Sequence, residues 1–200
     1  YFSHPNYANS PLPGNIVAEW NAFAQELLQP TSTPMPGMPM PMPTISMSKS
    51  FVILAYMQAA VYDALVAIEG GYAPYNAGIL AFKNPNASRE AAVSTAAYLI
   101  LDNYLKTESN YLTDIKPVLD AQYADALAAI PDGITKTDGI TLGTEAAAGI
   151  IILRTGDVLT GMDGYVVPAP GPGVWEPNVM PDGTVVTPMD PWMRNLKPFL

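Results

Sequence analysis

The sequence contains no cysteine and a single histidine, His4, among its 200 residues. The absence of cysteine excludes disulfide bonds, thiol nucleophiles and thiolate metal sites. A serine–histidine–acid triad would have to use His4, which lies in a polar, proline-bearing segment, and the Gly-x-Ser-x-Gly turn that presents such a serine is absent. We therefore predict no catalytic residue in this sequence.

Charge is also scarce, and most of it is negative. Charged residues make up 14% of the chain and the formal net charge is -9, with only nine lysines and arginines. Such a chain repels the phosphate backbone of nucleic acids and the anionic surface of membranes. Nucleic acid is therefore not expected as a partner, whereas the hydrophobic fraction of 49% is ample for a folded core.

Proline and glycine, by contrast, are concentrated in particular segments. Residues 1–14 read as an N-terminal arm, residues 30–43 as a linker rich in methionine and proline, and residues 156–200 as a C-terminal strap rich in proline and glycine. Proline fixes φ and removes a backbone donor, so the alternating prolines of residues 30–43 exclude a helix or an inner strand there. Two short runs in the strap, residues 165–167 and 184–187, could pair as a hairpin. The strap is expected to cover the helices, anchored by Trp175, Trp192 and Phe199.

Between these segments, apolar residues recur at helical spacing. The first stripe holds Val17, Trp20, Phe23 and Leu27. The predicted helices cover residues 15–29, 51–68 with Ser46 or Ser48 as the cap, 89–106 capped by Ser88, 111–130 with Pro117 in the first turn or at a kink, and 134–155. The sequence thus predicts one all-α domain over residues 1–200, a bundle of five to six helices followed by the strap.

Two predicted helices carry additional signals. Residues 51–68 are apolar and long enough to span a membrane, but Asp63 in the middle favours a buried core helix, and no membrane span is expected. The expected partner of Asp63 is Arg154, with Lys49 as a second candidate; a calcium or magnesium site that uses Asp63, Asp157 or Asp163 is the alternative. In the last helix, Gly139, Gly143 and Ala147 form a small-residue stripe that would let another helix approach closely.

Several fragments occur in a characteristic order along the chain. They are residues 17–21, 59–64, 130–133, 139–143 with Ala146, Ala147, Arg154 and Asp157, then 173–177, and finally 191–192 through 198–199. This ordered set resembles the N-terminal helical part of vanadium-dependent haloperoxidases of the phosphatase-like superfamily. The resemblance implies a helical scaffold, and in such enzymes it implies a second bundle that holds vanadate through a lysine, two arginines, a Pro-Ser-Gly-His stretch and a further histidine.

The chain departs from that family where the chemistry would lie. It has no Pro-Ser-Gly-His stretch, Gln58 stands where a family histidine is expected, and neither Arg154 nor Arg194 belongs to an Arg-Pro pair. No catalytic residue of the family can be transferred to this chain. Two interpretations stay open: an N-terminal fragment whose catalytic half is absent, or a stand-alone protein that uses the scaffold to hold a ligand.

Aromatic and methionine side chains on the predicted helices are candidates for binding a small hydrophobic molecule. Apolar walls with a few hydroxyl groups suit an elongated apolar ligand, and a buried tyrosine hydroxyl needs a hydrogen-bond partner. The candidate residues are Phe51, Tyr56, Met57, Tyr62, Tyr98, Tyr104 and Tyr123. Plain core packing is the competing interpretation. For Met35, Met38, Met40, Met42 and Met47, a copper(I) site competes with a plain linker.

Two features bear on the cellular location. The chain starts at Tyr1 without methionine, which we interpret as the processed N-terminus of a secreted protein. Asn86-Ala87-Ser88 is an acceptor triplet for N-glycosylation in a predicted loop. The leading expectation is a secreted, non-catalytic, haloperoxidase-like protein that carries a hydrophobic ligand, such as the pigment of a small fungal chromoprotein. A structural or storage protein is a further alternative.

Overall fold

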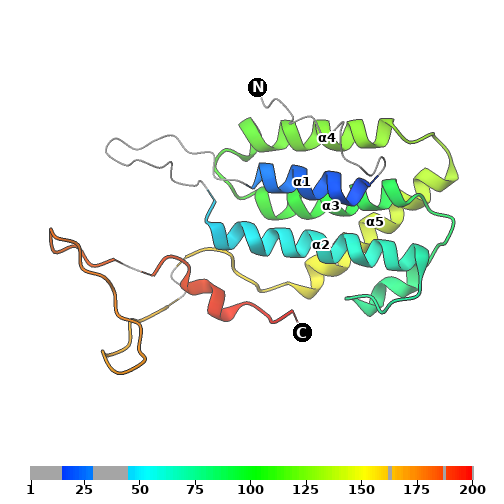
Figure 1. Ribbon diagram of the computed structural model, residues 1–200. Helices are drawn as coiled ribbons and strands as arrows, with labels where there is room; N and C mark the ends of the chain where they lie inside the picture. Colours follow the sequence, from blue (N-terminus) through cyan, green and yellow to red (C-terminus); the bar gives the residue numbers. More distant parts are fainter. Residues whose placement is uncertain (1–14, 29–44, 162–163, 187, 200) are drawn as a thin grey trace. The chain divides into compact units, whose positions relative to one another are not determined.

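The computed structural model describes residues 15–28, 45–161, 164–186 and 188–199 (Figure 1). They form two compact units, divided between Leu153 and Arg154, which are described separately. The helices of the first unit are α1 (Ile16–Leu27), α2 (Met47–Glu69), η2 (Ala77–Phe82), α3 (Arg89–Leu105), η3 (Tyr111–Ile115), α4 (Lys116–Ala128) and α5 (Ile134–Leu153). The predicted all-α class is confirmed. The predicted arm and linker, residues 1–14 and 30–43, lie outside the described residues.

Three of these helices begin at polar caps, and the sequence predicts two of them, one at Ser46 or Ser48 and one at Ser88. The side chains of Asn15, Ser46 and Ser88 each accept a hydrogen bond from the backbone N–H three residues further on. Each cap satisfies a donor that the first helical turn would otherwise leave without an intrahelical acceptor. Ser46, rather than Ser48, is therefore the residue that starts α2.

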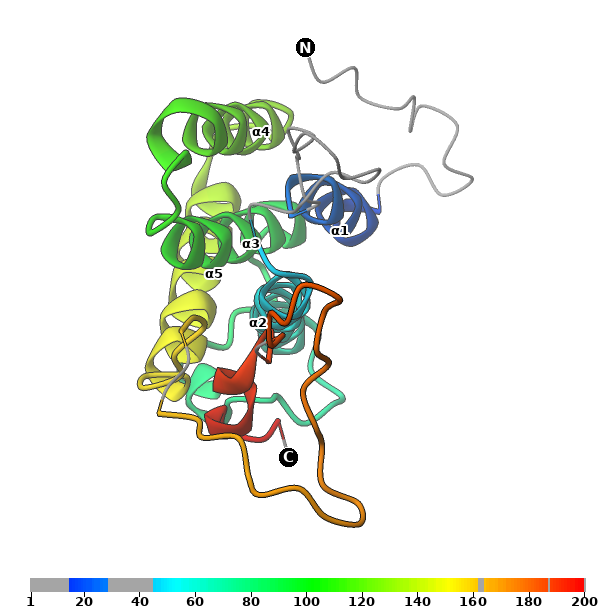
Figure 2. The same ribbon diagram turned by 90° about the vertical axis from the view of Figure 1, so that its left-hand side faces the viewer.

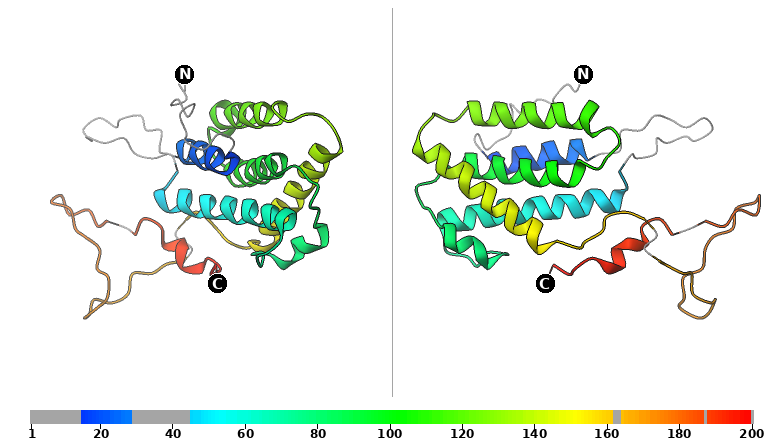
Figure 3. Two further views of the ribbon diagram at one scale, coloured as in Figure 1. Left: turned by 45° about the vertical axis from the view of Figure 1, so that its right-hand side comes forward. Right: turned by 180° about the vertical axis from the view of Figure 1, so that it is seen from behind.

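Helix α3 is the centre of the first unit. It lies between α4 and α2, with α1 beside it (Figures 1 and 2), and α5 crosses α3 and α2 at an angle on the far side (Figure 3). The predicted small-residue stripe of α5 meets α3: a Cβ added to Gly139 would lie 2.8 Å from the Ala91 Cβ, and one added to Gly143 would lie 2.8 Å from the Thr95 Cβ. Glycine at both positions is what permits this close approach.

Helix α2 is the longest apolar segment and most of it is buried. Of the described helices, it is the one whose length and composition would allow it to cross a membrane, yet 61% of its most apolar window is buried inside the protein. Asp63 is completely buried within it. This pattern is that of a core helix, as the sequence predicts.

Asp63 has backbone partners within its own unit. Its carboxylate accepts hydrogen bonds from the backbone N–H groups of Tyr75, at 2.6 Å, and Asn76, at 2.9 Å. Asp63 therefore holds the loop that follows α2 on its own helix. Burial raises the pKa of the Asp63 carboxyl, while the two backbone hydrogen bonds lower it.

The fourth predicted helix is divided in two. Residues 111–115 form one turn with π-type hydrogen bonds (η3), and α4 follows from Lys116, with Pro117 in its first turn. Proline is tolerated there because the first backbone N–H groups of a helix have no intrahelical acceptor. Only Leu119 of α4 is buried. This helix is therefore held to the unit by little apolar surface, a feature that bears on the site described below.

The second unit is irregular apart from the short helix η4 (Pro191–Asn195). The predicted pairing of residues 165–167 with 184–187 is wrong: in the described part of this unit, the bridge joins Val179 to Val185. The turn between them is local, since Gly183 adopts φ 87° and the Thr184 N–H donates to the Asp182 carboxylate. A short loop closes with less entropy loss than the longer, proline-rich connection from residue 167.

Interactions between its two ends close the second unit. The Arg154 Nη1 donates to the Lys197 carbonyl oxygen at 2.7 Å, the Lys197 N–H donates to the Asp157 carboxylate at 2.9 Å, and the Arg154 guanidinium lies 4.0 Å from the centre of the Phe199 ring. Of the predicted anchors, Trp192 is buried, but 47% of the Trp175 surface is exposed.

Candidate functional site

Four of the seven predicted ligand-contacting residues form two aromatic pairs on α3. Tyr98 of α3 stacks on Tyr123 of α4, with ring centroids 4.3 Å apart and an interplanar angle of 14°. Tyr104 of α3 packs against Tyr56 of α2, with centroids 5.0 Å apart. The sequence therefore identified residues that meet in space, but they meet at two helix interfaces on α3.

The remaining three predicted residues do not join either pair. Met57 is fully buried in α2, whereas 64% of the Phe51 surface and 42% of the Tyr62 surface are exposed. Tyr62 donates its hydroxyl hydrogen to the Ala73 carbonyl oxygen at 2.8 Å.

The tyrosine hydroxyls of the α3–α4 interface find their partners within the protein. The Tyr98 hydroxyl donates to the Asp120 carboxylate at 2.8 Å, and the Tyr123 hydroxyl lies 3.0 Å from the Thr95 hydroxyl. The hydrogen-bond partner that a buried tyrosine hydroxyl needs is therefore supplied here by protein side chains. The ring faces, rather than the hydroxyls, are therefore the part of this pair that could recognise a ligand.

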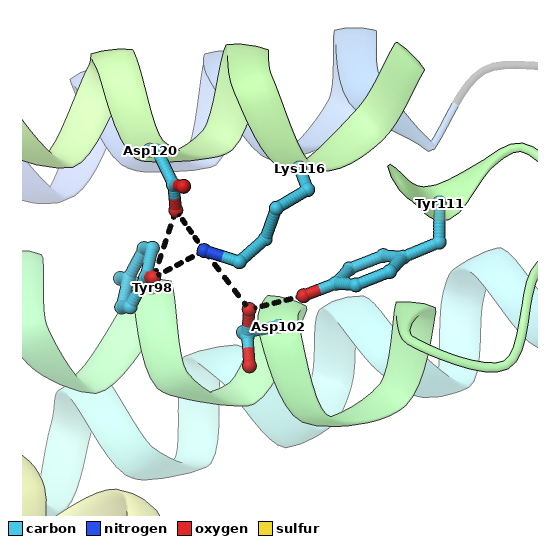
Figure 4. A network of polar contacts seen from close by, with 5 residues as sticks. All are labelled: Tyr98, Asp102, Tyr111, Lys116 and Asp120. Carbon is cyan, nitrogen blue, oxygen red and sulfur yellow. Dashed lines mark hydrogen bonds and ion pairs between the residues drawn. The ribbon is translucent and has the colours of Figure 1, made fainter. Parts of the chain in front are cut away.

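Tyr98 of the stacked pair belongs to a polar network of five residues: Tyr98, Asp102, Tyr111, Lys116 and Asp120 (Figure 4). The Lys116 ammonium lies at its centre, where it donates to the Asp120 carboxylate and, at 3.0 Å, to the Tyr98 hydroxyl. It also lies 3.8 Å from the Asp102 carboxylate, which accepts a 2.5 Å hydrogen bond from the Tyr111 hydroxyl. The network therefore joins α3, η3 and α4 through one cation and two carboxylates.

The network stabilises particular protonation states. Hydrogen bonds to Asp120 and Tyr98 raise the pKa of Lys116, and the hydrogen bond from Lys116 lowers the pKa of Asp120. Burial, followed by the hydrogen bond to Asp102, raises the pKa of Tyr111 to about 12. Burial also raises the pKa of Tyr98. At neutral pH the lysine is therefore a cation, Asp120 an anion, and both tyrosines are neutral.

These protonation states limit the chemistry that the network can perform. A lysine nucleophile must lose its proton, and a general base works best with a pKa near the working pH, so the shifts of Lys116 and both tyrosines oppose such roles. A fixed cation beside two carboxylates and two neutral phenols is suited to holding helices in register and to forming hydrogen bonds at the edge of a bound molecule.

Asp102, Lys116 and Asp120 are not among the site residues predicted from the sequence. A signal for them exists: Tyr98 and Asp102 are four residues apart on one helix, and Lys116 and Asp120 are four apart on another, which places each pair on one helix face. The sequence alone could not show that the two faces meet, because their meeting depends on the turn at Tyr111–Ile115.

The predicted metal ligands and the glycosylation site are placed as follows. Both Asp63 oxygens accept backbone hydrogen bonds, Asp157 accepts one from Lys197, and Asp163 lies outside the described residues. Across residues 15–28, 45–161, 164–186 and 188–199, no group of three His, Asp or Glu residues could hold a metal ion.

Asn86, the predicted glycosylation site, is exposed in the loop before α3.

Comparison with protein-family models, characterised proteins and solved structures finds no match to this chain. The interpretation of the site therefore rests on its geometry.

Proposed function

We propose that this chain is a non-catalytic binding protein that holds a small, flat, apolar molecule between α3 and α4, against Tyr98 and Tyr123. The observation that carries the proposal is the face-to-face stack of these two rings, 4.3 Å apart, at the interface of a helix with a single buried residue. A planar molecule that entered there would exchange one ring–ring contact for two. Conjugated pigments are molecules of this kind.

The energetics of the interface support entry at this position. Opening α4 exposes Leu119, whose burial is worth about 2–3 kcal/mol. Opening the α2–α3 interface, which holds the Tyr56–Tyr104 pair, would instead expose many of the buried apolar residues of α2. Because α4 is the easier helix to displace, the Tyr98–Tyr123 pair is the more accessible of the two aromatic pairs.

The polar network supports binding rather than catalysis. Its lysine is held as a cation and its tyrosines as neutral phenols, so it can form hydrogen bonds to a polar group at one end of an apolar ligand. An elongated ligand with a carbonyl or hydroxyl group at one end would place that group near Lys116 while its apolar part contacts the rings.

The test begins with a visible absorption spectrum of the purified native protein, followed by solvent extraction and mass spectrometry of the extract. We expect an apolar molecule with a conjugated or aromatic system in the extract. Tyr98→Ala and Tyr123→Ala should each reduce the retained amount at least tenfold. Tyr72→Ala, which removes a tyrosine with 76% of its surface exposed, is the matched control and should retain the ligand. An empty extract from native protein would contradict the proposal.

A second candidate is the helical front half of a haloperoxidase-like enzyme whose catalytic half is absent from this sequence. The supporting observation is that residues carrying the family resemblance make framework contacts. The Trp20 Nε1 donates to the Ser94 hydroxyl at 2.9 Å, Asp63 holds residues 75–76, and Gly143 allows α5 to approach α3. Sequencing of the transcript beyond Leu200 tests this candidate, which requires a Pro-Ser-Gly-His stretch downstream.

A further inference from the structure

The C-terminal strap exposes apolar side chains along most of its described length. More than a third of the surface of each of these residues is accessible: Val166, Trp175, Val179, Met180, Val185 and Met189. Exposure of apolar surface to water is unfavourable. Singly exposed apolar residues are common on proteins, but a series within one segment is typical of an interaction surface.

The strap is not a loose tail, because its ends are tied together. The Lys197 Nζ donates to the Thr155 carbonyl oxygen at 2.8 Å, next to the contacts of Arg154 and Asp157 described above. The Arg194 guanidinium lies 5.4 Å from the centre of the Tyr165 ring. The segment between these contacts is presented as a closed loop, which lowers the entropy lost when it binds a partner.

The charged side chains that the loop exposes between its closing contacts are acidic. Glu176 and Asp182 are exposed, whereas Arg154, Arg194 and Lys197 make the contacts that close the loop. The apolar residues are therefore bordered by carboxylates. A complementary surface would be apolar in the middle, with lysine or arginine side chains at its edge.

Two other occupants fit these observations less well. Much of the strap is irregular, and lipid hydrocarbon cannot satisfy the backbone N–H and C=O groups of irregular chain. Anionic headgroups would in addition be repelled by the carboxylates. A second copy of the chain would bring carboxylates against carboxylates, and each copy carries a net charge of -9.

The hairpin adds a means of main-chain recognition. The Met180 N–H donates to the Thr184 carbonyl oxygen and the Val186 N–H donates to the Asn178 carbonyl oxygen, both at 2.8 Å. In this antiparallel register, the N–H and C=O groups of Val179 and Val185 are directed to the outer edges. Such an edge can pair with an extended segment of another protein.

We propose that the strap is a docking arm for a protein partner that presents an apolar groove bordered by basic side chains. The proposal is independent of the α3–α4 ligand site, since it uses different residues and a different unit of the chain.

The experiment uses the full chain carrying a photo-crosslinking residue at position 179 or 189, with extract of the source cells. We expect one partner, crosslinked through the strap, whose yield falls at least tenfold with Val179→Asp/Val185→Asp and with Glu176→Lys/Asp182→Lys. The yield should also fall as salt is raised. Asp125→Lys, an exposed charge reversal on α4, is the matched control and should leave the yield unchanged.

Several outcomes would overturn the proposal. Equal yields from the charge-reversed variant, or crosslinks from a control position on α4, would show that the strap does not select a basic partner. A dimer measured by light scattering and lost with the Val179→Asp/Val185→Asp change would identify a second copy as the occupant. Flotation of the native chain with phosphatidylcholine vesicles, lost with the same change, would identify a lipid surface instead.

Discussion

At Gly143, one missing side chain determines how two helices pack. A Cβ at this position would lie 2.8 Å from the Thr95 Cβ and even nearer to the Ala92 carbonyl oxygen, which belongs to the backbone and cannot rotate away. The α3–α5 interface therefore depends on glycine for steric reasons, and its φ value is not involved.

Gly143→Ala should lower the free energy of unfolding by about 2–3 kcal/mol, because the helices must separate to accommodate the methyl group. Urea denaturation followed by circular dichroism measures the change. Gly171→Ala is the matched control, since its nearest neighbour would be the Val174 Cγ2 at 3.8 Å, an ordinary contact. Equal stability of the two variants would contradict the close-packing interpretation.

Asp63 is a second single residue that stabilises the fold, because its carboxylate accepts hydrogen bonds from the backbone N–H groups of residues 75–76. Asp63→Ala should cost about 2–4 kcal/mol of unfolding free energy, since two partly buried donors lose a charged acceptor. Amide exchange of Tyr75 and Asn76, measured by NMR, should accelerate in this variant. Asp125→Ala, at an exposed position, should change stability by less than about 0.5 kcal/mol.

At the scale of elements, α4 differs from its neighbours in how it is attached. Helices α2, α3 and α5 bury many apolar residues, whereas α4 buries only Leu119 and is joined to α3 by the polar network and one ring stack. A helix attached in this way should open before the rest of the unit. That property makes it a suitable cover for a ligand site.

The attachment of η3 and α4 to α3 should weaken at both acid and alkaline pH. The pKa of Asp120 is lowered in the folded protein, so its contribution is present above the unfolded value of 3.8 and is lost as pH falls through the folded pKa. The pKa of Tyr111 is raised to about 12 from 10, so its contribution is present below pH 10 and is lost as pH rises towards 12.

Thermal unfolding followed between pH 2 and pH 12 tests both directions. Asp120→Asn should flatten the acid limb, and Tyr111→Phe should flatten the alkaline limb. The Asp120 side chain is 47% exposed, so its effect should be only about 0.5–1 kcal/mol. Asp125→Asn is the control for the acid limb. Identical acid limbs for native protein and Asp120→Asn would show that this ion pair does not contribute to stability.

At the scale of the whole molecule, the chain divides between Leu153 and Arg154. The core of the first unit consists of contacts among its own helices, chiefly between α3 and its neighbours α5, α2 and α4. The second unit is closed by its own contacts at Arg154, Asp157 and Lys197. Each unit thus has an internal source of stability.

A chain truncated after Leu153 should therefore keep its helices and unfold cooperatively. Far-ultraviolet circular dichroism should show a helical spectrum that is preserved per residue of the first unit, with a single thermal transition. Loss of that transition would mean that the helices need the second unit to fold. A shift of less than about 5 °C would agree with a self-sufficient helical core.

The sequence by itself determined the helical class, the approximate positions of the helices and two of their caps. These features depend on local patterns: apolar spacing, serine before the first turn, and proline or glycine at the ends. It also identified the small-residue stripe of α5 and four tyrosines that pair on α3, because residue type and periodicity specify which side chains face inward.

The partners of polar groups were decided only by the tertiary structure. Asp63 binds a loop of its own unit, the hairpin pairs Val179 with Val185, and Lys116 lies between two carboxylates from different helices. A charged side chain has several possible partners along a sequence, and the distance between them depends on turns such as Tyr111–Ile115 and Asp182–Gly183. Apolar burial is non-directional and leaves a periodic signal, whereas a hydrogen bond requires one particular geometry that only the folded chain supplies.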